Sequence, residues 1–259
     1  ASNIGDIEIA LFSGEAANAG SVGLGVFSEN SINSGSIQIG SFFDSTANVG
    51  SVDSGSFLGT SSNQGSVTEA TFADTSINSG SVDVAVFSGS SSNVSYVASA
   101  SFADTASNNG SVDVAVFSGS AVNSGTIDTA FFFDGASNVG TITQEAVFSD
   151  TASNAGYVDN ATFYGSGTNV GIINSGIFAD TAVNAGAVNG DVQFYGDAIS
   201  TENSVISGNV AFENPNAIQG GTILGNTGIV VANFSSYSVC VFSANCLSEE
   251  NYSNNLKNI

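Results

Sequence analysis

An asparagine returns every fifteen residues along most of this chain, and that fixed period restricts the fold more than any other feature of the sequence. In nearly every unit the Asn is followed by Gly, then Val or Ile, then a small Ala or Gly, and then Phe, which gives the motif N-x-G-x-[VI]-x-x-[AG]-x-F. One inserted residue lengthens the tenth unit, after which the period resumes. The thirteen repeated asparagines are Asn3, Asn18, Asn33, Asn48, Asn63, Asn78, Asn93, Asn108, Asn123, Asn138, Asn154, Asn169 and Asn184.

The unit predicts strands rather than helices. Fifteen residues are too few for a pair of helices, and the Gly, Ser, Thr, Val and Phe content has no helical period. Asn, Gly and Val occupy alternate positions 1, 3 and 5, and the small residue and Phe occupy positions 8 and 10, which is typical of two short strands joined at a corner. One unit then makes one turn of a coil, and coils stack about 4.8 Å apart. We expect an all-β parallel β-solenoid (β-helix) of about thirteen 15-residue coils.

Stacking turns each repeated position into a column of equal residues. The Phe column and the Val or Ile column beside it are expected to form a slender core, and the small residue leaves room for the rings. Asn tolerates the backbone of a bend, and its amide can hydrogen-bond to the Asn above and below. We therefore interpret the Asn column as structural rather than as a set of ligands. Representative members of the two columns are Phe72, Phe87, Phe102, Phe117, Asn78, Asn93, Asn108 and Asn123.

The repeat weakens after Asn184. Gln193 stands where Phe is expected, and Phe194 follows one position later. We expect two regions, a β-solenoid over residues 1–196 and, over residues 197–259, a degenerate coil with a non-repetitive, β-rich C-terminal segment that caps or assembles the protein.

The two cysteines, Cys240 and Cys246, lie close together in this C-terminal segment. A disulfide that closes a small loop is the favoured interpretation, because a metal site would need more ligands than two cysteines.

The charge of the chain is one-sided, with 23 Asp and Glu against a single base, Lys257, and a formal net charge of −22. Nucleic acid is excluded as a partner, because phosphate binding needs several Lys or Arg residues. No apolar run approaches the roughly 20 residues of a membrane helix, so no membrane span is expected. The chain lacks His, and its carboxylates recur at equivalent positions of the coils, which is typical of a surface rather than of a catalytic site. We predict no enzymatic activity and no cofactor.

Two residues after the Phe, acidic residues alternate with Gly over several units. Alternation doubles the spacing of like charges and weakens their repulsion, which is the favoured interpretation. A row of weak Ca²⁺ sites is the alternative, because carboxylate oxygens suit this cation. The candidates for such sites are Asp44, Asp74, Asp104 and Asp134.

The repeated units over residues 3–194 resemble the tandem-repeat β-solenoids of bacterial, archaeal and viral surface proteins, namely adhesins, fibres and filament subunits. This resemblance implies an extracellular structural or adhesive role, with the protein itself, as a homopolymer, or a surface glycan as partner. Insect antifreeze proteins also use fifteen-residue coils, so ice binding is a lesser alternative. The flat Thr array that ice binding requires is missing here, because Tyr96 and Tyr157 interrupt the corresponding column of Ser and Thr.

Several outward positions of the first units are apolar, which is typical either of a weakly apolar surface or of a contact between molecules. We favour a lateral contact between molecules. Separately, we expect strands within residues 228–242 to pair with the edge of the first coil of another copy, which would stack the molecules head to tail into a filament. A discrete rod that acts as a cell-surface or viral adhesin is the alternative. The expected assembly contacts are Ile9, Leu11, Leu24, Val26, Ile39, Val230, Val231, Phe234, Val239 and Val241.

The chain starts in the middle of a coil, because Ala1, Ser2 and Asn3 match the residues that lead into Asn154. We expect this start to result from removal of a secretory signal, which places the protein outside the cell or on its surface; proteolysis or an engineered start are the alternatives.

Overall fold

The computed structural model describes residues 2–201, 204–212 and 221–223 of the 259-residue chain. Over these residues it is an all-β parallel β-solenoid of about 14 turns of about 15 residues, which confirms the fold class that the period predicts. A helix with the length and apolar character needed to cross a membrane does not occur in this part of the chain. The chain divides into two compact units, Ala1–Thr129 and Ala130–Ile259. The sequence-based boundary at residue 196 stays a prediction.

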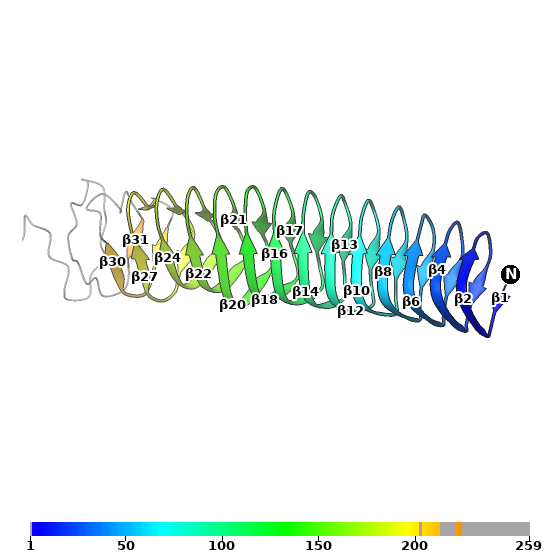
Figure 1. Ribbon diagram of the computed structural model, residues 1–259. Coiled ribbons are helices and arrows are strands. Elements are labelled where there is room, and N and C mark those ends of the chain that lie inside the picture. The colour runs from blue at the N-terminus through cyan, green and yellow to red at the C-terminus, as the bar shows by residue number, and fades with distance from the viewer. Residues whose placement is uncertain (1, 202–203, 213–220, 224–259) are drawn as a thin grey trace, which may run out of the picture. The chain divides into compact units, whose positions relative to one another are not determined.

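Each regular coil contains one short strand that ends at the Asn and one long strand that ends at the Phe (Figure 1). The corner between them needs Gly because neighbouring coils approach each other closely there. A Cβ atom on Gly35 would lie 2.0 Å from the carbonyl oxygen of Gly20, so a side chain would force the coils apart.

The first unit contains nine short strands and the long strands that alternate with them. The short strands are β1 (Ser2–Asn3), β3 (Ala17–Asn18), β5 (Ile32–Asn33), β7 (Ala47–Asn48), β9 (Ser62–Asn63), β11 (Ile77–Asn78), β13 (Ser92–Asn93), β15 (Ser107–Asn108) and β17 (Val122–Asn123). The long strands are β2 (Asp6–Phe12), β4 (Ser21–Phe27), β6 (Ser36–Phe42), β8 (Ser51–Phe57), β10 (Ser66–Phe72), β12 (Ser81–Phe87), β14 (Tyr96–Phe102) and β16 (Ser111–Phe117), and β18 (Thr126–Phe132) crosses the boundary between the units.

The second unit is less regular towards its C-terminal side. Its strands are β19 (Ser137–Asn138), β20 (Thr141–Phe148), β21 (Ser153–Asn154), β22 (Tyr157–Phe163), β23 (Thr168–Asn169), β24 (Ile172–Phe178), β25 (Val183–Asn184), β26 (Ala187–Val188), β27 (Val192–Phe194), β28 (Ile199–Ser200), β29 (Val205–Ile206), β30 (Val210–Phe212) and β31 (Thr222–Ile223).

Pairing between coils is parallel and in the register of the repeat. In the first unit each long strand pairs with the next so that Phe faces Phe, as in Phe72 with Phe87, and each short strand pairs so that Asn faces Asn, as in Asn78 with Asn93. The second unit keeps this register through two irregularities. The inserted residue of the tenth unit forms a bulge in β20 between Ile142 and Glu145.

The other irregularity explains the displaced Phe of the last unit. The long strand is split there, and both halves pair with β24, β26 through Ala187 and β27 through Phe194. The extra residue is accommodated between the halves, so Phe194 still faces Phe178 and Gln193 points outward and is exposed.

The core of each unit is a column of stacked phenylalanine rings. In the first unit, ring centroids are 4.6 to 4.9 Å apart from Phe12 to Phe117, with interplanar angles of 3 to 13°. In the second unit they are 4.7 to 5.1 Å apart from Phe132 to Phe194. The strand spacing therefore sets the ring spacing, and from Phe27 onward these rings are almost completely buried.

Replacement of one ring in the first column should destabilise the protein. Phe102→Ala opens a cavity between Phe87 and Phe117, which should lower the free energy of unfolding by about 3 to 5 kcal/mol. The control is Phe43→Ala, because Phe43 lies on the surface and is 38% exposed. Denaturant unfolding followed by circular dichroism measures both, and equal stability of the two variants would contradict the role of the column.

Three consecutive coils bury hydroxyl groups that have no hydrogen-bond partner among the described residues, Thr46, Ser61 and Ser76. They occupy one column, one position before the short strand. Its next member, Ser91, is equally buried but donates a hydrogen bond to the carbonyl of Phe72 at 3.2 Å. A buried hydroxyl without a partner costs free energy, so each of these three hydroxyls is expected to lower the stability of the fold.

Removal of one such hydroxyl should stabilise the protein. Ser61→Ala is expected to raise the free energy of unfolding by about 1 kcal/mol, because it removes an unpaired polar group. The matched control, Ser91→Ala, removes a hydroxyl that has a partner and should lower stability. Denaturant titration of the two variants tests the difference, and a loss in Ser61→Ala as large as that in Ser91→Ala would show that the Ser61 hydroxyl is satisfied in solution.

Candidate functional site

The Asn column is a continuous ladder of buried amides within each unit. Asn78 donates from Nδ2 to the Oδ1 of Asn93 at 2.8 Å and to the carbonyl of Gly80 at 3.0 Å. Its Oδ1 accepts from Nδ2 of Asn63 at 2.8 Å and from the backbone N–H of Gly80 at 3.2 Å. Asn93 and Asn108 make the same bonds, with Ser95 in place of Gly after Asn93. Both donors and both acceptor sites of the Asn78 amide are used inside the fold, so this amide has no hydrogen-bonding capacity left for a ligand.

The alternating acid and Gly column lies at a turn with left-handed backbone geometry. Asp44, Asp74, Asp104 and Asp134 have φ between 54 and 59°, and the intervening glycines have φ of 63 to 66°. Gly adopts this conformation freely, and Asp adopts it more readily than most residues. Backbone geometry therefore restricts the residue types in this column, which periodicity alone does not reveal.

An Asp-Thr pair in this turn hydrogen-bonds to both backbone groups, the N–H and the C=O, of the Gly one coil earlier. Oδ2 of Asp74 accepts the backbone N–H of Gly59 at 3.1 Å, and the Thr75 hydroxyl donates to the carbonyl of Gly59 at 3.0 Å. The same two bonds join Asp104 and Thr105 to Gly89, and Asp180 and Thr181 to Gly165. We call this arrangement the Asp-Thr clamp. It gives the alternation of acid and Gly a structural role in addition to the spacing of charges.

The acidic residues of the turn column are spread over separate coils. In the part of the chain that the structure describes, no group of three or more His, Cys, Asp or Glu residues lies close enough to hold a metal ion. Cys240 and Cys246 lie outside the described residues.

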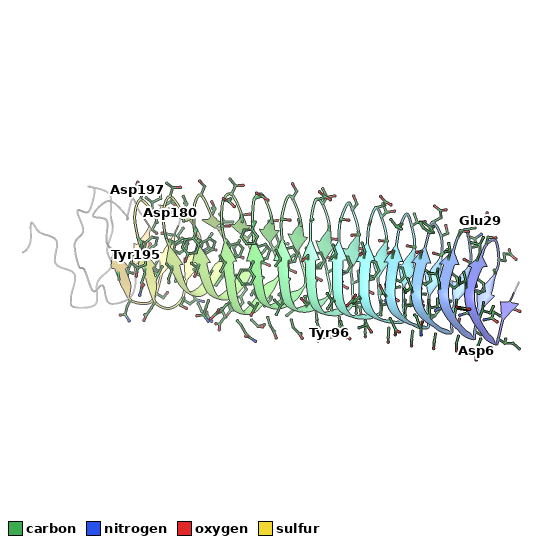
Figure 2. All side chains as sticks on the ribbon, viewed as in Figure 1. Asp6, Glu29, Tyr96, Asp180, Tyr195 and Asp197 are labelled. Atoms are coloured by element: carbon green, nitrogen blue, oxygen red, sulfur yellow. The ribbon has the colours of Figure 1, made fainter. Side chains whose placement is uncertain are left out.

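Tyr96 replaces Ser in an outward column of the first unit and contacts an acid on the next coil. Its hydroxyl donates to Oδ2 of Asp113 at 2.7 Å. This hydrogen bond is the main cause that raises the pKa of Tyr96 above its ordinary value, because the bond exists only for the neutral phenol. Desolvation and the negative charges of Asp113, Asp83 and Asp128 act in the same direction. Figure 2 places Tyr96 on the edge of the coils opposite to the turn carboxylate of Glu29.

The Tyr96 hydroxyl should lose its proton at a lower pH when Asp113 is neutralised. Asp113→Asn removes the charged acceptor and one of the repelling charges, so the pKa of Tyr96 should fall. Ultraviolet absorbance titration, with Tyr96→Phe subtracted to isolate this tyrosine, measures the change. Asp53→Asn, several coils away, is the control; the same titration curve in both variants would contradict the contact.

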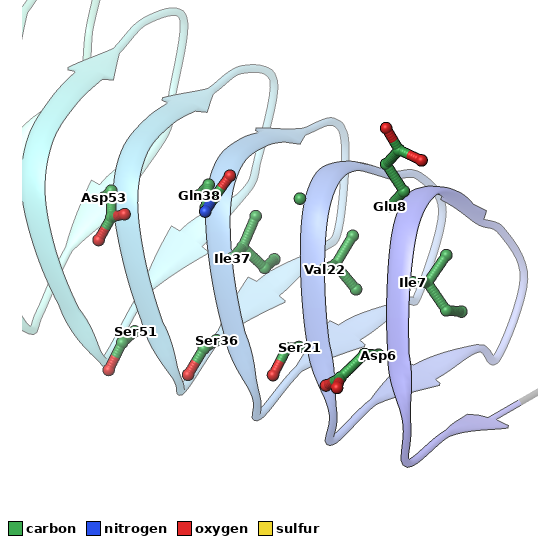
Figure 3. Close-up of a pocket in the computed structure, with 11 residues that line it drawn as sticks. Asp6, Ile7, Glu8, Ser21, Val22, Ser36, Ile37, Gln38, Ser51 and Asp53 are labelled. Atoms are coloured by element: carbon green, nitrogen blue, oxygen red, sulfur yellow. The ribbon is translucent and has the colours of Figure 1, made fainter.

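An open groove follows the long strands β2, β4, β6 and β8, and it is lined by polar residues together with Ile7, Val22 and Ile37 (Figure 3). One edge carries Asp6 and a row of serines, and the other carries Glu8 and Asp53 with Gln38 between them, while Gly23 leaves a gap. Glu8 and Asp53 are three coils apart, roughly 14 Å at the usual strand spacing, whereas paired carboxylates of glycosidases are roughly 5 to 9.5 Å apart. This pair is therefore too widely spaced for that chemistry.

The expected apolar contact surface lies on the outward face of β2, β4 and β6. Ile9 is 70% exposed, Leu11 73% and Ile39 55%; Leu24 is also exposed, and Val26 is partly buried. We call these five residues the apolar patch. The other expected assembly contacts, Val230, Val231, Phe234, Val239 and Val241, lie outside the described residues.

Comparisons of this chain with protein-family models, with curated proteins and with solved structures found no match.

Proposed function

We propose that this protein is an extracellular structural protein that assembles with copies of itself into a filament or surface fibre by head-to-tail stacking of solenoids. The observation that carries the proposal is that one contact is repeated between regular coils. Phenylalanine rings stack at 4.6 to 4.9 Å, and Asn amides bond at 2.7 to 2.8 Å, in the same register from coil to coil of the first unit. A coil of a second copy can offer these same groups, so the contact inside the molecule is also a suitable contact between molecules.

The distribution of side-chain chemistry supports a structural role. Phe and Asn, the most regular large side chains of the repeat, are used in the core and the ladder. The Asp-Thr clamp uses three of the turn carboxylates to join neighbouring coils. With a net charge of −22, copies of the protein repel one another at long range. Assembly therefore needs the short-range complementarity of stacked coils.

The apolar patch supports contacts along the sides of a filament. Its exposed side chains stand where other coils of the same unit carry Ser54, Ser56, Ser99 and Ser101, so apolar residues are not required at these positions by the fold. Apolar surface of this kind favours burial against another molecule.

Deletion of residues 228–259 should leave a folded protein that does not polymerise, because strands within residues 228–242 are expected to pair with the first coil of another copy in the head-to-tail contact. Sedimentation velocity over a range of concentrations and negative-stain electron microscopy measure assembly, and circular dichroism checks the fold. Filaments formed by the deletion variant, or an intact protein that stays monomeric at high concentration, would contradict the proposal; the second result favours a discrete adhesin.

A second pair of variants separates side contacts from end contacts. Replacing Ile9, Leu11 and Ile39 by Ser should reduce bundling of filaments without preventing their formation. The matched control replaces Val84 and Val86, which are exposed at the same columns of another coil, by Ser.

A further inference from the structure

A row of aromatic side chains runs over alternate coils of the second unit. Phe133, Tyr164 and Tyr195 occupy the same position of their coils, the residue that directly follows the long strand. Phe133 is 36% exposed, Tyr164 is 44% exposed and Tyr195 is partly exposed. The two intervening coils have Ser149 and Ala179 at this position, so no bulky side chain at this position separates the rings.

The backbone holds these residues in equivalent places. The carbonyl of each one accepts a hydrogen bond from the N–H three residues later, at 3.1 Å for Phe133, 3.0 Å for Tyr164 and 3.2 Å for Tyr195. The three rings therefore leave the chain from the same type of turn.

The ladder between coils also continues through this position. The N–H groups of Ser149, Tyr164, Ala179 and Tyr195 each donate to the Phe carbonyl of the preceding coil, at 2.8 to 3.0 Å. Successive aromatic residues are thus two strand spacings apart, roughly 9.6 Å. A fixed interval of this kind is a template for a ligand that repeats at the same interval.

The surroundings of the row are polar on one side and more apolar on the other. Towards the turn lie Asp150 and Asp180, both exposed, and the hydroxyls of Thr151 and Thr181 follow them. Towards the strand, Val147 and Ile177 are the outward residues of β20 and β24. Aromatic faces flanked by carboxylates and hydroxyls match a sugar, which has an apolar C–H face and a rim of hydroxyl groups.

We propose that Phe133, Tyr164 and Tyr195 bind a neutral β-1,4-linked polysaccharide that lies across the coils of this unit. In an extended β-1,4-linked chain every second sugar presents the same face, and each sugar advances the chain by about one strand spacing. Successive aromatic residues then stack on every second sugar of the chain, one ring to one sugar. The turn carboxylates accept hydrogen bonds from the sugar hydroxyls. A polyanionic glycan does not fit, because the row has carboxylates beside it and no cationic side chain among its neighbours in the described chain. The proposal goes beyond the filament and is independent of it.

Calorimetric titration with defined oligosaccharides tests this site. Cellohexaose and chitohexaose, which reach across all three aromatic residues, should bind more tightly than the corresponding disaccharides, while maltohexaose, which has α-1,4 linkages, should not bind. Tyr164→Ala removes the middle ring and should weaken hexasaccharide binding roughly tenfold or more. Tyr96→Ala is the matched control, because Tyr96 is 43% exposed but belongs to the first unit and to a different column of the repeat. The affinity of this variant should equal that of the unchanged protein.

Three results would overturn the proposal: no binding of either β-1,4 hexasaccharide, equal binding of maltohexaose, or equal affinity of Tyr164→Ala and the unchanged protein.

Sedimentation of Tyr164→Ala without sugar gives a further readout. If this substitution alters self-association and the protein binds no sugar, the row is a contact between copies and the glycan site is excluded. Filament formation is scored separately, so failure of one proposal leaves the other measurable.

Discussion

The buried Asn amide is the interaction on which the rest of the fold depends. A primary amide enclosed in a protein must find partners for two N–H donors and for its carbonyl oxygen, and one coil alone supplies only the backbone groups of its own corner. The remaining bond must come from the next coil, at the height where that coil carries its own Asn. Each coil thus specifies the position of its neighbour. The phenylalanine column gains its ring contacts in the register that the amides impose.

Local repetition explains how much of this fold the sequence predicts. A period of fifteen residues with apolar and Asn positions at fixed places specifies both the strands and their pairing, because equal residues must stack in a parallel solenoid. The site of the bulge does not follow from the sequence. One extra residue between Asn138 and Asn154 could be accommodated at several places in the coil. In the structure the bulge lies in β20 between Ile142 and Glu145, so that Ile142 and Phe148 both keep their places in the core columns.

Surface features were harder to predict because they depend on neighbouring coils rather than on neighbouring residues. The Asp-Thr clamp becomes recognisable only when Asp74 is placed beside Gly59, and the same holds for Tyr96 and Asp113 on successive coils. The aromatic row has a signal in the sequence, since Tyr164 directly follows a column Phe, but reading it requires comparison of every second coil. The left-handed turn also leaves only an indirect trace, in a column limited largely to Gly and acids.

The clamp has a consequence for how a protein of this kind can change its length. Since an acid on one coil binds the Gly of the coil before it, the structural period at the turn is two coils, although the backbone period is one. Duplication or loss of a single coil would put Gly beside Gly or acid beside acid, whereas a change by two coils preserves every clamp. The alternation is interrupted twice, by Glu29 and Asp44 across the regular strand β6 and by Asp134 and Asp150 across the coil that contains the bulge in β20. Where acid and Gly alternate and the clamps are formed, we expect natural variants to differ in length by even numbers of coils.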